Sequence, residues 1–232
     1  MNFLFRKPNA EYYYDDQFLY AKKGDEVYKL ALFDQHFYKL RLVDGIAILE
    51  IDGLRMHLVK EFKTPLEYSQ EVVKNLKINE VDVVFDTCLG LGYTALEASK
   101  FAQHIVTCEI SQAVLSLAKW NPWSNGLFEN EKIDIFEADS SEKINEFETG
   151  SFSVIIHDPP RLTTAESLYS LIFYKELYRV LKKGGRLFHY VGSLGSKNKG
   201  RSIEKEVAKR LESAGFKQIK YNRKLQGLFA QK

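Results

Sequence analysis

VDVVFDTCLGLGYT, residues 81–94, is the stretch that decides the fold of this chain. Its first half is an apolar run interrupted only by Asp82, which predicts a buried strand of a parallel sheet over residues 81–86. Gly90 and Gly92 follow in a predicted loop, and a helix is expected directly after them. A strand, a glycine loop and a helix N-terminus in this order form a site for a nucleotide-like ligand. The glycines let the backbone approach that ligand closely, because they carry no Cβ.

Predicted strands and helices alternate from this stretch to near the C-terminus. The apolar runs predict strands at 81–86, 104–109, 132–137, 152–157 and 185–191. Helices are expected near 94–101, 111–119, 140–147, 165–182 and 201–214. Such alternation is typical of an α/β fold, in which helices cover both faces of a parallel sheet. The tail differs, since the runs at 217–224 and 228–231 follow one another directly and predict an antiparallel hairpin at the edge of the sheet.

Residues 1–60 have a different pattern, dense in aromatic side chains and in Asp and Gly. Asp-Gly pairs separate three apolar runs here, and Asp-Gly between such runs is a strong hairpin signal. We therefore expect a β-meander with strands at 37–43, 46–51 and 54–59. A meander of this length buries little surface alone. We expect it to pack on the rest of the chain or to contribute to an oligomer interface, which makes these hairpins the candidate contact of a homodimer.

A helix is expected after this extension. Thr64 and Pro65 suit the N-cap and the first helical position, and Glu67 completes a capping-box pattern. We therefore place the domain boundary after residue 60, with a β-hairpin extension at 1–60 and the main domain at 61–232.

The composition is that of a globular protein of ordinary size. The chain has 232 residues, 45% hydrophobic and 28% charged, which suits one domain with a small extension. No apolar run approaches the roughly 18 residues of a membrane helix, and no export signal is recognisable, so we expect a cytoplasmic protein with no membrane partner. Two cysteines without clustered histidines predict neither a metal site nor, in a reducing compartment, a disulfide. A net charge of +2 does not by itself indicate a nucleic-acid partner.

The glycine loop carries a cofactor motif. The run from Gly90 to Ala95 fits G-x-G-x-x-A, which is a weak dinucleotide signal alone. Asp86 ends the strand, and three residues separate it from Gly90. This D-x-x-x-G-x-G pattern resembles motif I of class I S-adenosylmethionine (SAM) methyltransferases, in which the loop wraps the amino-acid part of SAM. Cys88 stands where that motif has its first glycine, so the first turn must accommodate a Cβ.

Acidic residues follow the next two predicted strands. Glu109 ends one of them, and a carboxylate there can accept both ribose hydroxyls of NAD or of SAM. Asp139 follows the third strand, where an acidic residue of SAM enzymes accepts from the adenine amino group. Asp139 is equally a good helix N-cap, and both roles are compatible. Thr87, Ile110 and Ser140, each beside one of the acidic residues, complete the expected cofactor-binding set.

The most discriminating motif after the loop is His157-Asp158-Pro159-Pro160-Arg161, at the end of the fourth strand. Two prolines make a rigid turn with few donors, at the sheet edge where ligands of α/β folds bind. The turn resembles motif IV of methyltransferases that act on amino nitrogens. There the acidic residue and a proline carbonyl accept hydrogen bonds from the target nitrogen, which assigns Asp158 and Pro159 to catalysis. Pro160 and Arg161 are candidate substrate contacts, although Arg161 replaces the aromatic residue that stacks on a base.

Two further segments have open interpretations. His189 lies where the fifth strand reaches the same edge, so it is either a substrate-facing base or a hydrogen-bonded core residue, and we slightly favour the second. AKWNPWSNGL, residues 118–127, resembles the A-x-x-N-x-x-x-N-G-L segment of several RNA methyltransferases. Its Trp120 and Trp123 are expected to be packing anchors.

Taken together, the motifs from Leu54 onward resemble one predicted archaeal SAM-dependent methyltransferase family. They are LRMH, TPLEYS, DTCLGLGYTA, NPWS, HDPPR and GGRLFHYVG. The resemblance implies a Rossmann-like, seven-stranded mixed sheet with the last strand antiparallel. The N-terminal hairpins also resemble the β-domain of spermidine synthases, which share the core fold but transfer an aminopropyl group from decarboxylated SAM.

The leading hypothesis is a methyltransferase that uses SAM to methylate a nitrogen, in an RNA such as tRNA or rRNA or else in a small molecule. The alternative is an aminopropyl transferase acting on a polyamine, although Arg161 would repel such a cation. A non-catalytic SAM- or RNA-binding subunit is disfavoured, because both the glycine loop and the Asp-Pro-Pro turn are intact. A nicotinamide dehydrogenase explains neither that turn nor the tail hairpin.

Overall fold

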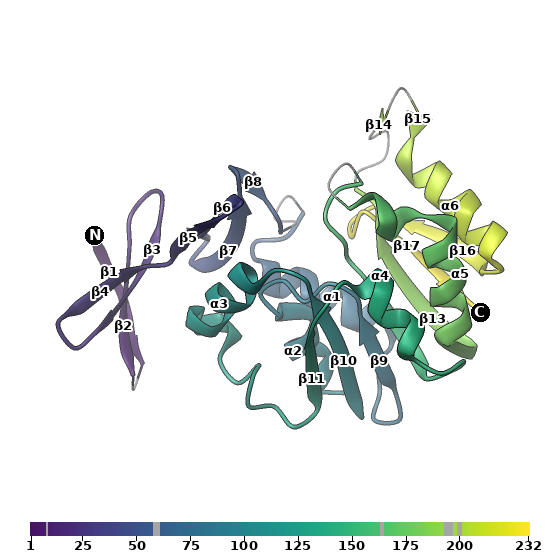
Figure 1. The fold of residues 1–232 in the computed structure, drawn as a ribbon, viewed down its shortest axis with the longest axis horizontal. Coiled ribbons are helices and arrows are strands. Elements are labelled where there is room, and N and C mark those ends of the chain that lie inside the picture. The colour runs from purple at the N-terminus through teal and green to yellow at the C-terminus, as the bar shows by residue number, and fades with distance from the viewer. Residues whose placement is uncertain (8, 58–60, 163–164, 193–196, 199–200) are drawn as a thin grey trace.

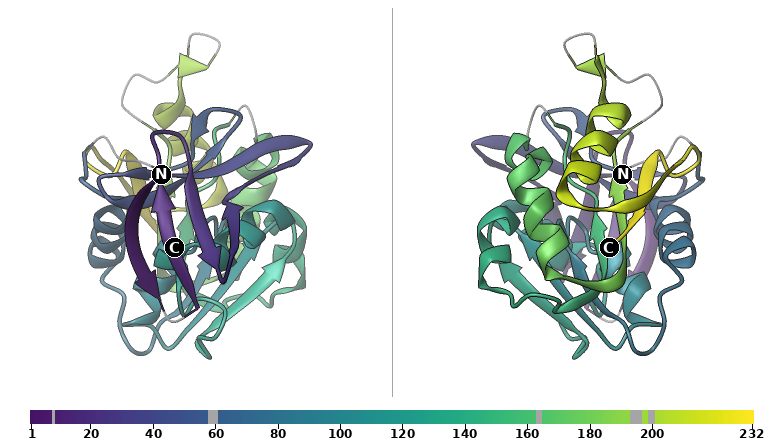
Figure 2. Two further views of the ribbon diagram at one scale, coloured as in Figure 1. Left: turned by 90° about the vertical axis from the view of Figure 1, so that its left-hand side faces the viewer. Right: turned by 90° about the vertical axis from the view of Figure 1, so that its right-hand side faces the viewer.

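The computed structural model describes residues 1–7, 9–57, 61–162, 165–192, 197–198 and 201–232. Two small N-terminal sheets lie at one end of the molecule, and an α/β unit forms the rest (Figure 1). Figure 2 shows the molecule from its two ends, with the N-terminal strands toward the viewer on the left and the helices α5 (Leu171–Val180) and α6 (Ile203–Ala214) toward the viewer on the right.

The central sheet has seven strands in the order β11-β10-β9-β12-β13-β17-β16. Neighbours pair in parallel except β17, which runs antiparallel to both β13 and β16. This arrangement confirms the expected α/β fold, its seven-stranded mixed sheet and the hairpin at its edge. The strands are β9 Val83–Asp86, β10 His104–Glu109, β11 Ile133–Glu137, β12 Phe152–His157, β13 Leu181–Tyr190, β16 Lys217–Asn222 and β17 Gly227–Gln231.

Helices cover both faces of this sheet. Val84 and Ile156 pack with α1 and α2, whereas their neighbours Phe85 and Ile155 pack with α5 and α6, as the alternation of side chains along a strand requires. Within the described ranges, no helix is long and apolar enough to cross a membrane. The α-helices are α1 Pro65–Leu76, α2 Tyr93–Ser99, α3 Gln112–Trp120, α4 Ser140–Lys143, α5 Leu171–Val180 and α6 Ile203–Ala214, and the 3-10 helices are η1 Pro122–Ser124, η2 Ile144–Glu146 and η3 Glu166–Tyr169.

Several predicted boundaries differ from the structure, two of them for a clear local reason. The helix expected over 165–182 is divided at Ser170, whose hydroxyl accepts a 3.0 Å bond from the Phe173 N–H and so begins α5 as a new helix after η3. The strand β13 begins at Leu181 instead of residue 185, because Leu181 already pairs with β12 ahead of a register shift.

The N-terminal residues form two four-stranded antiparallel sheets. Both expected Asp-Gly hairpins are present, with φ of 48° and 79° at Asp44-Gly45 and of 47° and 78° at Asp52-Gly53, as in type I′ turns. The third predicted strand is shorter than expected, and residues 58–60 lie outside the described part of the chain. The strands are β1 Asn2–Lys7, β2 Ala10–Tyr14, β3 Leu19–Lys23 and β4 Glu26–Lys29 in the first sheet, and β5 Ala31–Asp34, β6 His36–Val43, β7 Ile46–Ile51 and β8 Leu54–Arg55 in the second.

The N-terminal sheets share a core with the α/β unit. Leu40 and Leu49 of the second sheet pack in one cluster with Tyr93 of α2 and Val114 of α3. The N-terminal sheets are therefore joined to the segment that follows the glycine loop.

Candidate active site

The polar residues of interest gather at the C-terminal edge of the central sheet. Asp86, Glu109 and His157 are the last residues of β9, β10 and β12, which are neighbours in the sheet. The chain runs outward from β9 to β11 and then returns to the other side of β9 as β12. The edge between β9 and β12 is therefore a topological switch point, where open α/β sheets bind their ligands.

The glycine loop is tied to the end of the neighbouring strand β10. The Leu89 N–H donates to the Cys108 carbonyl at 2.8 Å, and the Gly90 N–H donates to Glu109 Oε2 at 2.9 Å. Gly90 has φ of 56°, and a Cβ added there would meet no atom within 4 Å. Open space therefore adjoins this residue, which is what close approach of a ligand requires.

Gly92 has a different reason to be glycine. Its φ is 77°, and an added Cβ would collide with the side chain of Leu127. Gly92 was expected to bind the cofactor, but its lack of a side chain is explained by packing within the protein.

Glu109 holds the glycine loop with one carboxylate oxygen and the N-cap residue of α3 with the other. Oε2 accepts from Gly90, and Oε1 accepts from the Ser111 N–H at 3.0 Å. Burial raises the pKa of Glu109 in spite of these bonds. Each oxygen can accept one further hydrogen bond, so ribose hydroxyls still fit. Ile110 beside it is 68% exposed and offers an apolar surface at the same edge.

Asp86 is the buried acid of the site. The residue is 1% exposed, and its Oδ2 has no hydrogen-bond partner among the described residues. Burial first, and then the charge of Asp158, raise its pKa to about 8. A buried acceptor without a partner fits the ammonium group of a SAM-type ligand, because a nearby cation stabilises the ionised carboxylate.

Asp139 is the N-cap of α4. Its Oδ1 accepts from the Ser141 N–H at 2.7 Å, and Ser140 is buried beside it. The Ala138 N–H donates to the Glu109 carbonyl at 3.0 Å, which brings this segment to the end of β10. The capping interpretation is therefore present in the structure, and the placement leaves the adenine interpretation open.

The Asp158 carboxyl group is held by a residue that sequence reasoning missed. The Tyr68 hydroxyl of α1 donates to Asp158 Oδ2 at 2.9 Å. Burial raises the pKa of Asp158 to about 6, and the Tyr68 bond opposes this rise. The helix that begins in TPLEYS was predicted. Its contact with a turn 90 residues further along the chain could not be predicted, because no pattern in the sequence around Tyr68 indicates it.

The rest of the Asp-Pro-Pro turn is held by a residue of the 3-10 helix η3. The Tyr169 hydroxyl donates to the Pro160 carbonyl at 3.0 Å. Pro159 is buried, whereas Pro160 and Arg161 are exposed. Burial and the charge of Asp158 raise the pKa of Tyr190 to about 12, so this phenol also lies near the turn and stays protonated.

Two buried histidines lie beneath the turn. His157 Nε2 lies 3.0 Å from the Leu168 carbonyl and Nδ1 lies 2.7 Å from Thr87 Oγ1, so Nε2 carries the proton and the Thr87 hydroxyl donates to Nδ1. His189 is fully buried, with Nε2 2.8 Å from the Tyr174 hydroxyl. Desolvation lowers the pKa of both histidines, so both are neutral. This placement matches the core alternative for His189 and not the alternative of a residue that faces the substrate. Thr87 likewise points into the protein.

Comparison with known proteins identifies the family. Residues 36–222 match the model of the spermine/spermidine synthase domain. "Uncharacterized protein MJ1233" of Methanocaldococcus jannaschii is 43% identical over 219 residues, which is 94% of this chain and 75% of that protein. "Putative protein N5-glutamine methyltransferase MJ0928" of the same archaeon is 32% identical over 189 residues, 73% of this chain and 88% of that protein.

Solved structures share the fold at low sequence identity. A spermidine synthase in complex with the transition-state analogue AdoDATO has a TM-score of 0.71 and 18% identity, and the match covers 97% of this chain and 81% of that one. A SAM-dependent methyltransferase from Aquifex aeolicus has a TM-score of 0.52 and 17% identity, over 70% of this chain and 87% of that one. The chain therefore belongs to the spermine/spermidine synthase domain family and has the class I SAM-methyltransferase fold with an N-terminal β-extension.

Proposed function

We propose that this protein is a SAM-dependent methyltransferase that transfers a methyl group to a nucleophilic nitrogen. The cofactor is of the SAM type, SAM or decarboxylated SAM, in keeping with the family and with the methyltransferase among the relatives. The observation that carries the proposal is the Asp158 carboxyl group. Tyr68 holds it in a rigid Asp-Pro-Pro turn, close enough to Asp86 that its charge raises the pKa of Asp86.

The cofactor side of the site consists of residues on β9, β10 and the segment after β11. Gly90 leaves room for the ligand, and Asp86 accepts a hydrogen bond from its ammonium group. Glu109 accepts from the ribose hydroxyls, while Ile110 and Asp139 border the adenine. SAM supplies a methyl group activated by the positive charge on its sulfur.

The acceptor side consists of Asp158, Pro159 and Tyr68. With a pKa of about 6, Asp158 is ionised at neutral pH. The Tyr68 hydroxyl donates to Asp158 Oδ2. Oδ1 and the Pro159 carbonyl can therefore accept hydrogen bonds from the N–H group of the substrate, and these bonds direct the nitrogen lone pair toward the methyl group of SAM. These contacts would speed the reaction by orienting the substrate nitrogen. Holding reactive groups at contact distance in the correct orientation produces large increases in rate.

The preferred acceptor is a nitrogen of an RNA, tRNA or rRNA, and a small molecule is the second choice. The exposed Arg161 adjoins the acceptor turn, and a guanidinium there suits an acceptor that also carries phosphate or carboxylate.

The second candidate function is aminopropyl transfer from decarboxylated SAM. It is favoured by the family match and by a fold likeness that extends over the N-terminal sheets as well as the α/β unit. The position of Arg161 disfavours it, because a polyamine acceptor is itself cationic.

Calorimetry with SAM and with decarboxylated SAM separates the two functions. We expect SAM to bind more tightly; a preference of about tenfold or more for decarboxylated SAM, or roughly 1.4 kcal/mol, would support aminopropyl transfer instead. Mass spectrometry of nucleosides and metabolites from cells lacking the gene then identifies the acceptor.

The variant Asp158→Ala tests the acceptor role. We expect it to bind SAM within several-fold of the wild type and to lose transfer of radiolabelled methyl groups to extracts of the deletion strain. Asp134→Ala, at an exposed carboxylate on β11, is the matched control and should keep full transfer. Transfer that survives in Asp158→Ala would place the acceptor role elsewhere, and SAM binding without any transfer by the wild type would indicate a non-catalytic subunit.

A further inference from the structure

Residues 121–127 form hydrogen bonds with the glycine loop and with the first residue of α2. The Ser124 hydroxyl donates to the Leu91 carbonyl at 2.6 Å. The Asn121 amide donates to Ser124 Oγ at 2.7 Å and to the Tyr93 hydroxyl at 2.9 Å. Leu91 and Tyr93 stand on either side of Gly92, so these bonds hold the loop on both sides of the N-cap residue of α2.

This set of hydrogen bonds, the Asn121 clamp, consists of Asn121, Ser124 and Tyr93. All three residues are buried. Each hydroxyl donates once and accepts once, and the two amide hydrogens of Asn121 go to the two hydroxyls. Fully paired buried networks of this kind fix one arrangement of the groups they join.

The clamp also reaches the N-terminal sheets. The Tyr93 hydroxyl donates to the Ala47 carbonyl of β7 at 2.7 Å. The Tyr12 hydroxyl of β2 donates to the Trp120 carbonyl at 3.3 Å, and Lys7 of β1 donates to the Pro122 carbonyl. Both acceptors lie in or next to the segment that carries the clamp.

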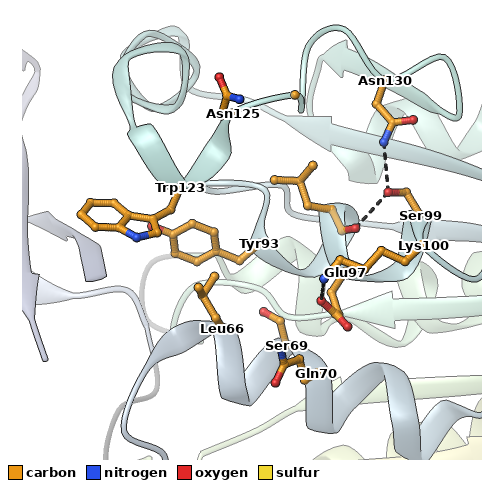
Figure 3. A pocket seen from close by; sticks show the side chains of 12 residues that line it. Leu66, Ser69, Gln70, Tyr93, Glu97, Ser99, Lys100, Trp123, Asn125 and Asn130 are labelled. Carbon is orange, nitrogen blue, oxygen red and sulfur yellow. Dashed lines mark hydrogen bonds and ion pairs between the residues drawn. The ribbon is translucent and has the colours of Figure 1, made fainter. Parts of the chain in front are cut away.

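An open pocket adjoins the residues of the Asn121 clamp. A pocket of about 440 Å³ lies between α1, α2 and the segment after α3, and Tyr93 and Trp123 form one wall of it (Figure 3). Tyr93 itself is buried in the core shared with the N-terminal sheets, so packing and the hydrogen bonds of the Asn121 clamp together fix its position.

We propose that Tyr93 and Ser124 are positioning residues for the cofactor: through the Asn121 clamp they set the glycine loop in its binding geometry and couple it to β7 of the N-terminal sheet. The proposal rests on the cofactor assignment above. It accounts for the resemblance of this segment to one in RNA methyltransferases without a contact to RNA, since the segment acts on the cofactor loop.

Calorimetric titration with SAM tests the positioning role. Tyr93→Phe and Ser124→Ala each remove one hydroxyl and should weaken SAM binding about three- to tenfold, the range expected for one lost hydrogen bond. Ser99→Ala is the matched control, because it removes a buried hydroxyl at the other end of α2 that bonds to Leu96 and Asn130. It should lower the thermal midpoint comparably and leave SAM affinity unchanged.

Hydrogen exchange tests the coupling. SAM should slow amide exchange in β7 of the wild type, and Tyr93→Phe should abolish this protection while the glycine loop is still protected at saturating SAM. Unchanged SAM affinity in both folded variants, or no protection of β7 in the wild type, would overturn the positioning proposal and leave the cofactor assignment intact. Failure of the wild type to bind either SAM or decarboxylated SAM would overturn the cofactor assignment and the proposal with it.

Discussion

The Tyr68–Asp158 hydrogen bond sets the charge of the acceptor turn, and Tyr68→Phe isolates its contribution. The substitution removes one oxygen from a side chain that is 5% exposed and leaves Asp158 without this donor. A hydrogen bond to an ionised group is worth about 1.5–3 kcal/mol, which corresponds to a rise in the Asp158 pKa of about one to two units. From a starting value of about 6, this rise leaves the carboxyl group at least half protonated at neutral pH.

The sign of the stability change follows from the same shift. The pKa of Asp158 is already raised from 3.8 in the folded protein, so its contribution to stability is most favourable at low pH and declines as the pH rises toward 6. Tyr68→Phe extends this decline to about pH 8. The variant should therefore lose about 2–3 kcal/mol at pH 8, or about 4–12 °C in thermal midpoint, but only about 1 kcal/mol at pH 5, where the lost bond joins two neutral groups.

Two measurements check this reasoning. Carboxyl ¹³C NMR of aspartate-labelled protein, with Asp158→Asn for assignment, gives the pKa directly in wild type and variant. Thermal unfolding at pH 5 and pH 8 gives the stability difference. An Asp158 pKa that moves by less than half a unit, or a loss of stability that is the same at both pH values, would refute the assigned role of Tyr68.

Three further predictions concern the cofactor side. Gly90→Val should weaken SAM binding at least tenfold, or about 1.4 kcal/mol, while Gly150→Val, with a similar positive φ and the same open surroundings, should cost similar stability and leave affinity unchanged in calorimetry. Gly92→Ala should lower the thermal midpoint by several degrees, and the double variant with Leu127→Ala should lose less stability than the two single losses added together, because the smaller side chain removes the collision. Because burial holds the pKa of Asp86 near 8, SAM binding at pH 7 should release close to one proton, seen as a buffer-dependent binding enthalpy that Asp86→Asn abolishes.

The central sheet could be predicted because its signals are local. The Val-rich run before Gly90 ends in a strand at Asp86, and the two Asp-Gly turns form the expected hairpins. The expected site residues Asp86, Glu109 and Asp158 meet for a similar reason, since the carboxyl ends of parallel strands share one edge of the sheet.

The features that sequence reasoning missed depend on contacts distant in the chain. Strands β1, β4 and β5 carry several exposed residues without clean alternation, and β1 to β5 gain their order from pairing with one another and from the shared core with α3. Tyr68 reaches Asp158 only because α1 covers the face of the sheet beside β12. The burial of His189 depends likewise on Tyr174 of α5, which no pattern around His189 indicates.

The three acids at the sheet edge explain why the cofactor class is easier to assign than the transferred group. Burial raises the pKa of Asp86, Glu109 and Asp158, and Asp86, with a pKa of about 8, can hold a proton until a cation binds. Protein donors bond to Glu109 and Asp158, which leaves Asp86 Oδ2 as the acceptor for a ligand ammonium. SAM and decarboxylated SAM both carry an ammonium and a sulfonium, so this edge complements either one. Residues near the substrate must therefore distinguish methyl transfer from aminopropyl transfer. There the exposed guanidinium of Arg161 would repel a cationic polyamine, which favours the proposal of methyl transfer.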